Sequence, residues 1–240
     1  MSTRRFEDRT DAGRQLAAKL AHLRGQATVV LALPRGGLPI GYEVARELGA
    51  PLDVLNVRKL GVPWQEELAM GALAAGGVRV LNDDVIMSAG VSGEDIEAAT
   101  AAQQLELDRR ERLYRGGRPP RDLRGQTVVL VDDGIATGAT VRAALNVIRA
   151  QQPAKLVLAV PVAQRSVAAE LASEVDEMVC VTTPSDLYAI GMWYENFAQV
   201  SDDEVQSILA AAAAEMSPAR TTRSPDARRA GDGESGPPAA

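Results

Sequence analysis

The sequence predicts an α/β protein built on an open, mainly parallel five-stranded sheet with helices on both of its faces. Two observations support this fold class. Short runs such as Thr28–Leu33 (TVVLAL) and Thr127–Val131 (TVVLV) are apolar or β-branched at every position, as expected of strands that are buried on both sides. Between these runs lie segments whose apolar residues recur at helical spacing.

The predicted elements alternate along most of the chain. Helices are expected over residues 10–24, 38–48, 92–114, 140–150 and 165–173, and strands over residues 28–33, 52–57, 127–131, 156–160 and 177–181. Ser92 is a suitable cap for the long third helix. Ser201 and Glu204 form a capping-box pattern, which predicts one more helix after residue 201.

Two segments are left outside this alternation. Residues 70–82 (MGALAAGGVRVLN) place two glycines between short apolar runs, which predicts a β-hairpin flap. Residues 182–200 are expected to form a small cap, or hood. We therefore expect one domain over residues 1–216, with a flexible loop at about 58–82, and then a disordered tail over residues 217–240, which are rich in Pro, Gly, Ser and Ala.

The composition restricts the possible classes of function. The formal net charge of −6, from 26 basic and 32 acidic residues, argues against a broad nucleic-acid surface. Cys180 is the single cysteine and His22 the single histidine, so an intrachain disulfide is impossible and a Cys/His zinc site nearly so. We interpret His22 as a surface residue. The N-terminus lacks an apolar signal segment and no apolar run is long enough to span a bilayer, which predicts a cytoplasmic protein without a membrane partner.

Charged and glycine-rich segments follow three of the predicted strands. Pro34–Gly37 (PRGG) follows the first strand, Arg58–Gly61 (RKLG) the second and Asp132–Thr140 (DDGIATGAT) the third. In an open parallel sheet, ligands bind beyond the carboxyl ends of the strands. We therefore expect these three segments to meet at one crevice.

The last of these segments has the properties of a phosphate site. Gly134 and Gly138 permit a tight backbone, and Thr137 and Thr140 supply hydroxyl groups. The helix that follows offers free N–H groups and the positive end of its dipole. The spacing matches neither a Walker loop nor a dinucleotide fingerprint. The pattern therefore indicates a cradle for a single phosphate group.

Two adjacent carboxylates, Asp132 and Asp133, precede this cradle. A phosphate alone would be repelled by them. They suit a ligand that also carries hydroxyl groups or a divalent cation, and a ribose 5-phosphate meets both conditions. The alternative interpretation is an ordinary helix N-terminus with capping aspartates.

The segment Val128–Thr140 (VVLVDDGIATGAT) resembles the donor-binding signature of the type I phosphoribosyltransferases. Within that superfamily, the ALPRGG and RKLG segments resemble those of stand-alone predicted phosphoribosyltransferases whose acceptor is unassigned. The resemblance implies that 5-phosphoribosyl 1-diphosphate (PRPP) is the donor, that Mg²⁺ accompanies it and that the acceptor is a small molecule. A homodimer is usual in the superfamily.

The resemblance also implies roles for individual residues. Asp132 and Asp133 would bind the ribose hydroxyls of PRPP, and would contact Mg²⁺ directly or through water. The residues implied in phosphate binding are Gly134, Ala136, Thr137, Gly138, Ala139 and Thr140 for the 5′-phosphate, and Arg35, Gly36 and Gly37 for the diphosphate.

Arg58 and Lys59 look like the basic residues that precede a mobile, closing loop in this superfamily. Cations at that point would stabilise the charge that develops on the leaving diphosphate, so we expect both residues to belong to the catalytic machinery. A solvated Arg-Lys pair is the alternative. Glu66 and Glu67 could contact the closed loop or be surface charges, and we slightly favour the surface.

The cap is expected to select the acceptor. Four of the eight aromatic residues (two Trp, four Tyr and two Phe) fall within ten positions, namely Tyr188, Trp193, Tyr194 and Phe197. This clustering predicts either a stacking surface for a flat ring or a satellite core under a loop. Ala136 stands where the 6-oxopurine branch of the superfamily carries an aspartate that acts on the purine ring, which argues against a hypoxanthine or guanine acceptor.

The sequence thus predicts an enzyme of nucleotide metabolism that transfers 5-phosphoribosyl from PRPP to a nitrogen heterocycle. Two alternatives stay open. One is a non-catalytic regulator of the same fold that binds PRPP; such a protein would be expected to carry an added helix-turn-helix or a basic face, and the sequence indicates neither. The weaker alternative is a hydrolase or phosphatase that uses the same site.

Overall fold

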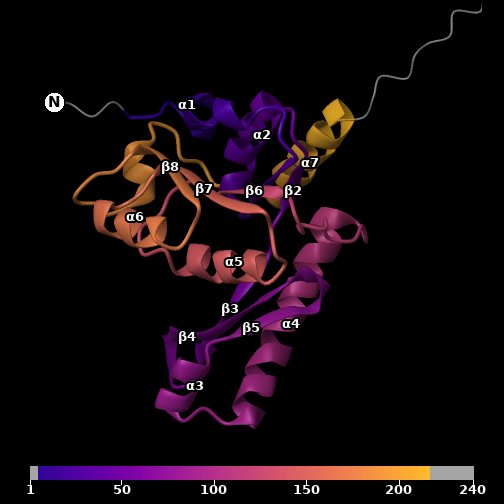
Figure 1. The fold of residues 1–240 in the computed structure, drawn as a ribbon, viewed down its shortest axis with the longest axis vertical. Helices are drawn as coiled ribbons and strands as arrows, with labels where there is room; N and C mark the ends of the chain where they lie inside the picture. The colour runs from indigo at the N-terminus through magenta and orange to yellow at the C-terminus, as the bar shows by residue number, and fades with distance from the viewer. Residues whose placement is uncertain (1–4, 217–240) are drawn as a thin grey trace, which may run out of the picture.

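The computed structural model describes residues 5–216 and confirms the predicted fold class. Its centre is a parallel sheet in the order β2-β1-β6-β7-β8 (Figure 1). The strands are β1 (Thr28–Ala32), β2 (Leu52–Val54), β6 (Thr127–Val131), β7 (Lys155–Val162) and β8 (Glu177–Thr182). The central pair β1 and β6 runs in register from Thr28↔Thr127 to Ala32↔Val131. The carboxyl ends of these two strands therefore lie side by side, which decides where a ligand site can form.

Helices cover both faces of this sheet. On one face lie α1 (Arg9–Lys19), α2 (Gly37–Leu48) and α7 (Asp202–Met216), and on the other lie α5 (Ala139–Arg149) and α6 (Arg165–Ala172) (Figure 1). The reason is the alternation of side chains along a strand. In β1, Val30 and Ala32 join the core under α2, whereas Val29 and Leu31 join the core over α5.

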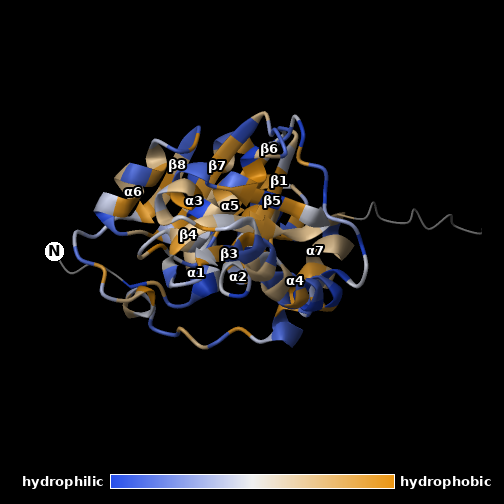
Figure 2. Cartoon of the chain, turned by 90° about the horizontal axis from the view of Figure 1, so that it is seen from below, coloured by the Kyte–Doolittle hydropathy of each residue, from blue (hydrophilic) through white to orange (hydrophobic). Residues whose placement is uncertain are grey.

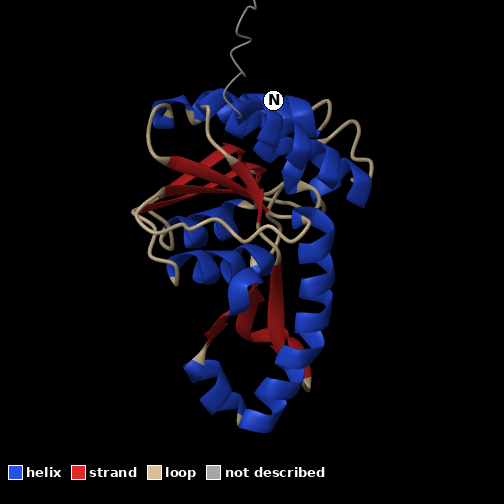
Figure 3. Ribbon diagram, turned by 90° about the vertical axis from the view of Figure 1, so that its right-hand side faces the viewer, coloured by secondary structure: helices blue, strands red, loops and turns tan. Residues whose placement is uncertain are grey.

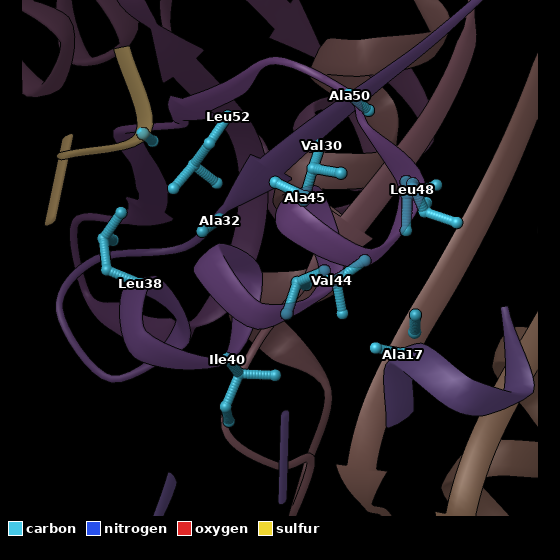
Figure 4. Close-up of a cluster of buried hydrophobic side chains, with 14 of the residues drawn as sticks. Ala17, Val30, Ala32, Leu38, Ile40, Val44, Ala45, Leu48, Ala50 and Leu52 are labelled. Atoms are coloured by element: carbon cyan, nitrogen blue, oxygen red, sulfur yellow. The ribbon is translucent and has the colours of Figure 1, made fainter. Parts of the chain in front are cut away.

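The core beneath α2 shows this packing in detail. Val30 and Ala32 of the sheet face Leu38, Val44 and other apolar residues of the helix (Figure 4). Hydrophobic residues gather between the helices and strands, while hydrophilic residues lie on the outer faces (Figure 2). None of the helices within residues 5–216 has both the length and the apolar character needed to cross a membrane.

A second sheet forms a lobe that projects from the core (Figures 1 and 3). Strands β3 (Val57–Val62), β4 (Gln65–Ala74) and β5 (Val78–Leu81) are antiparallel, and α3 (Asp83–Ala89) and the long α4 (Gly93–Arg115) belong to the same lobe. Leu60, Val62, Met70, Val91 and Leu107 form its own small core. The predicted hairpin over 70–82 is present as β4 and β5, whose connection contains two glycines with positive φ.

Two sequence predictions are wrong in this region. The single strand expected over residues 52–57 is divided, because β2 ends at Val54 and Val57 begins β3 in the other sheet. Residues 58–69, the part of the expected flexible loop that precedes the predicted hairpin, are largely strand, since β3 pairs with β4 and their apolar side chains pack against the lobe helices. Asn56 marks the point of departure: it is 2% exposed, and its Nδ2 donates to Glu111 Oε1 at 2.5 Å.

A buried ionic network attaches the lobe to the sheet. Arg115, near the end of α4, donates to Asp53 Oδ2 at 2.6 Å and to the carbonyl of Val54 at 2.5 Å. Glu111 lies 2.7 Å from the Arg115 Nε atom. Because Arg115 is only 6% exposed, this charge depends on its partners inside the protein. The network therefore holds α4 against the edge strand β2.

The ends of the chain differ in detail from the predictions. The first helix stops at Lys19, and His22 follows on a short 3-10 turn, η1 (Ala21–Leu23), where its side chain is about half exposed at 48%. The capping box before α7 is present, since Glu204 N donates to Ser201 Oγ and Ser201 N to the Glu204 carboxylate. Residues 217–240, predicted to be a disordered tail, lie outside the described part of the chain.

Candidate functional site

The acid pair lies at the centre of the sheet's carboxyl edge. Asp132 and Asp133 follow β6 directly, and the Asp133 amide donates to Asp132 Oδ1 at 2.9 Å. Burial, and then the charge of Asp133, raises the pKa of Asp132 well above its ordinary value. Burial also raises the pKa of Asp133, although Arg9 opposes this effect. Burial thus disfavours the charged form of both carboxyl groups in the ligand-free protein.

The loop between β1 and α2 touches the acid pair. A Cβ atom at Gly36 would lie 1.9 Å from Asp133 Oδ2, and one at Gly37 would lie 2.8 Å from the carbonyl oxygen of Val131. Only glycine allows such a close approach. The peptide bond between Pro34 and Arg35 is cis. The structure therefore brings Gly36 and Gly37 to the end of β6, as the strand-end argument predicted, whereas the Arg35 side chain lies 3.7 Å from Asp202 Oδ1 of α7.

The small residues after the acid pair lead into α5. Gly138 has φ of +78° and precedes the first helical residue, Ala139. Thr137 and Thr140 are exposed, and Ala136 is partly exposed. The first N–H groups of a helix have no partner within the helix, and they form the positive end of its dipole. This turn has the geometry of an anion site.

Arg9 is a site residue that the sequence reasoning missed. Its Nη2 and Nε atoms donate to Asp133 Oδ2 at 2.8 and 3.0 Å, and its Nη1 donates to the carbonyl of Ala198 at 2.7 Å. Its guanidinium carbon lies 3.9 Å from the ring centroid of Phe197. No local pattern marks this arginine, because its partner is 124 residues away in the sequence.

The cap is anchored to the acid pair by its aromatic residues. Tyr194 is 3% exposed, packs on Phe6 and Phe197 with centroid separations of 5.4 and 4.9 Å, and donates its hydroxyl to the carbonyl of Asp133 at 2.7 Å. Trp193 packs against the same cluster, whereas Tyr188 is 88% exposed. The four predicted aromatics therefore do not form one stacking surface, and Tyr194 belongs to a satellite core.

A cavity of about 780 Å³ reaches the loops after β1 and β6 only at Pro34 and Thr140, and its lining includes neither the acid pair nor Gly36 and Gly37. Pro34 of the β1–α2 loop and Thr140 of α5 line one side, and Arg58 and Lys59 of β3 line the other. Arg58 Nε donates to Gln103 Oε1 of α4 at 2.8 Å. The two cations thus lie on a strand rather than in the expected loop, because β3 pairs with β4 along its whole length.

Two further acids from the same prediction lie on β4. Glu66 is exposed and lines the same cavity as Arg58 and Lys59. Glu67 follows it on the strand.

The comparisons with known proteins agree with this geometry. The model of the phosphoribosyl transferase domain family matches residues 4–196. The chain belongs to the phosphoribosyl transferase family. A protein of Mycobacterium tuberculosis named "Putative phosphoribosyl transferase" is 53% identical over 204 residues, which are 85% of this chain and 46% of that protein. This phosphoribosyl transferase chain thus spans about half the length of the curated relatives it matches.

A solved structure extends the comparison to three dimensions. The protein TT1426 from Thermus thermophilus is 43% identical and superposes with a TM-score of 0.80, covering 85% of this chain and 97% of that one. The "Bifunctional protein PyrR" of Chloroflexus aurantiacus is 32% identical over 131 residues, or 50% of this chain and 62% of that protein. The family assignment therefore rests on matches to most of the described chain.

The donor groups of this phosphoribosyl transferase fit a metal that arrives with its ligand. Within residues 5–216, no three His, Cys, Asp or Glu side chains lie together as a metal site would require. The acid pair supplies two carboxylates, and one of them is already paired with Arg9. Mg²⁺ is commonly held by one or two carboxylates together with substrate phosphates and water. The site therefore suits Mg²⁺ bound chiefly by phosphate groups.

Proposed function

We propose that this chain transfers the 5-phosphoribosyl group of PRPP to a small-molecule acceptor and releases diphosphate. The observation that carries the proposal is the direct contact between the glycine loop and the acid pair, with the α5 N-terminus beside them. In this proposal the α5 N-terminus binds the 5′-phosphate, the acid pair binds the ribose and the glycine loop binds the diphosphate, all at the carboxyl edge of the sheet. The cavity of about 780 Å³, which Arg58, Lys59 and Thr140 line, gives room for part of such a ligand next to this edge.

Each part has a distinct role in the proposal. The backbone and hydroxyl groups of residues 136–140, with Gly134, hold the 5′-phosphate. Asp132 and Asp133 accept hydrogen bonds from the ribose 2′- and 3′-hydroxyls. The N–H groups of Arg35 and Gly36 bind the diphosphate, together with the side chains of Arg58 and Lys59, while Gly37 holds the turn because its N–H donates to the Leu33 carbonyl at 3.0 Å.

The chemical step follows from this placement. The bond between the ribose anomeric carbon and the diphosphate oxygen breaks, and a bond to an acceptor nitrogen forms, with inversion at that carbon. The acceptor nitrogen loses its proton to solvent, and the electron pair of the broken bond leaves with the diphosphate. Arg58 and Lys59 stabilise the charge that develops there, and removing one preorganised donor of this kind costs about 3 kcal/mol. When bound, Mg²⁺ would neutralise further phosphate charge.

The acceptor is expected under the cap. Phe197 is partly exposed beside Arg9, Trp193 is partly exposed in the same aromatic cluster, and both offer apolar surface to a flat heterocycle. Ala136 provides no carboxylate at the position that the 6-oxopurine branch uses. We therefore propose a nitrogen heterocycle other than hypoxanthine or guanine. We also propose that residues up to about 216 form the functional unit, with the cap at about 182–200.

The test is a release assay with purified protein, Mg²⁺, PRPP and a panel of nucleobases and other heterocycles. We expect diphosphate release with at least one acceptor, and a loss of at least tenfold in kcat/KM for Arg58→Ala and Lys59→Ala. Arg124→Ala, a change at an exposed arginine remote from the described cavity, serves as the matched control.

Two other results would lead to different conclusions. PRPP binding without turnover across the panel, and without any effect of the Arg58 and Lys59 variants, would identify a PRPP-binding regulator. Diphosphate release without an acceptor would identify a hydrolase. The homodimer implied by the family is tested separately by light scattering.

A further inference from the structure

Arg9 occupies an unusual position for a residue at the start of a helix. It begins α1, yet its guanidinium reaches the carboxyl edge of the sheet and is only 11% exposed. There it binds three oxygen or ring partners: the Asp133 carboxylate, the Ala198 carbonyl and the face of Phe197. One side chain thus joins the N-terminal helix, the cap and the acid pair.

The geometry at Asp133 is specific to one oxygen atom. Both Arg9 donors, Nε and Nη2, bind Oδ2, and neither binds Oδ1. The same Oδ2 atom faces Gly36, where an added Cβ would lie 1.9 Å from Oδ2 but 3.3 Å from Oδ1. Arg9 and Gly36 therefore enclose one oxygen of the carboxylate and leave the other directed away from them.

The backbone on the N-terminal side of Arg9 is hydrogen-bonded to the cap and to α1. Phe6 N donates to the carbonyl of Trp193 at 2.8 Å, and Glu195 N donates to the carbonyl of Phe6 at 2.8 Å. The Asp8 side chain caps α1 by accepting from Asp11 N at 2.8 Å. The position of Arg9 is therefore tied to the position of the cap.

We infer that Arg9 is a positioning residue that sets the orientation of Asp133 for the ribose of PRPP and makes that orientation depend on the position of the cap. The inference rests on the proposed function, because a ribose hydroxyl would donate to Asp133 Oδ1, the oxygen that Arg9 does not contact. Charge-assisted hydrogen bonds are short and directional, so two of them on one oxygen restrict the rotation of the carboxylate. Because Arg9 also binds the Ala198 carbonyl and the face of Phe197, the orientation of Asp133 is linked to the position of the cap.

The experiment is a double-mutant cycle on the affinity for PRPP in the presence of Mg²⁺, measured by calorimetry. We expect Arg9→Gln to weaken PRPP binding about tenfold or more, since a hydrogen bond to a charged group is lost. Arg9→Lys should recover part of the affinity, because lysine keeps the charge but not the planar pair of donors. Arg14→Gln is the control: Arg14 also lies on α1, but its side chain is 64% exposed and pairs with Glu43.

The cycle separates a positioning role from a merely structural one. If Arg9 acts through Asp133, the Arg9→Gln/Asp133→Asn double variant binds PRPP no more weakly than Asp133→Asn alone. If the losses of binding free energy from the two changes are additive, Arg9 acts independently of Asp133, and the inference is overturned. Thermal unfolding of each variant shows whether it is folded. If Arg9→Gln does not fold, Arg9→Lys replaces it in the comparison with Asp133→Asn.

The remaining outcomes distinguish this inference from the proposed function. Wild-type affinity in Arg9→Gln overturns the inference alone. Wild-type protein that binds PRPP but transfers nothing overturns the proposed transferase activity and leaves the cycle valid. Wild-type protein that does not bind PRPP overturns both.

Discussion

Replacing Gly36 by alanine is the most direct test of how this site is built. The backbone at Gly36 has φ of −61° and ψ of −30°, a conformation that any residue adopts without strain. The added methyl group, however, would lie 1.9 Å from Asp133 Oδ2 and 2.6 Å from its carboxyl carbon. The change therefore perturbs the acid pair through contact alone.

The size of the effect follows from these distances. Non-bonded carbon and oxygen atoms need more than about 3 Å, so the Asp133 carboxylate must shift by about 1 Å or more. Such a shift breaks the aligned bonds of 2.8 and 3.0 Å from Arg9. Loss of a hydrogen bond to a charged group costs about 1.5–3 kcal/mol, so PRPP affinity should fall by about 10- to 100-fold.

The assay is calorimetric titration with PRPP and Mg²⁺, together with thermal unfolding of the ligand-free protein. Gly93→Ala is the control, because an added Cβ there would meet no atom within 4 Å. Gly36→Ala that binds PRPP as tightly as the wild type would refute the assigned contact between the glycine loop and the ribose-binding acid. A large fall in affinity for Gly93→Ala would show that the effect is not local.

Three further changes test the surrounding structure. Arg115→Met should lower the free energy of unfolding by about 3–5 kcal/mol in a urea titration, because it leaves Asp53 buried without its partner; a change below about 1 kcal/mol would contradict the role of the network. Asp132→Asn should raise the Tm of the ligand-free protein at neutral pH while weakening PRPP binding. Because the pKa of Asp132 is raised in the folded protein, the wild type is most stable when this carboxyl is protonated, and its stability falls as the pH rises above the ordinary pKa of an aspartate. The Tm difference between Asp132→Asn and the wild type should therefore vanish near about pH 4. A difference that stays constant with pH would argue against the ionisation of Asp132 as its cause. Tyr194→Phe should cost about 1 kcal/mol of stability through loss of the bond to the Asp133 carbonyl, and an unchanged Tm would show that this bond contributes nothing net.

Several features of the protein could be predicted from the sequence because they are encoded locally. Thr127–Val131 is apolar throughout because β6 is buried on both faces, and the same pattern identifies the other central strands. The loops at Pro34–Gly37 and Asp132–Thr140 could be predicted to lie close together, because neighbouring parallel strands end at the same edge of the sheet. That argument required only the order of strands and the residues that follow them.

The hairpin over 70–82 could be predicted, but the rest of the lobe sheet and the contacts of the cap could not. Arg58 and Lys59 were expected in a loop, but β3 pairs with β4 and packs on α4, and such pairing depends on partners that local spacing does not reveal. The aromatics of the cap were ambiguous because stacking surfaces and satellite cores have the same composition. Only packing against Phe6 made Tyr194 part of a core.

The sequence by itself determined the class of fold and the chemical groups at the carboxyl edge of the sheet, where we propose phosphate binding. Short-range periodicity records which faces are buried, and glycine, threonine and aspartate at strand ends record which groups are free to meet a ligand. The tertiary structure alone decided that Arg9 reaches Asp133 across 124 residues and that Gly36 encloses the same oxygen atom. The physical reason is that an ion pair between distant segments is created by packing, and neither partner has a local pattern that marks the other.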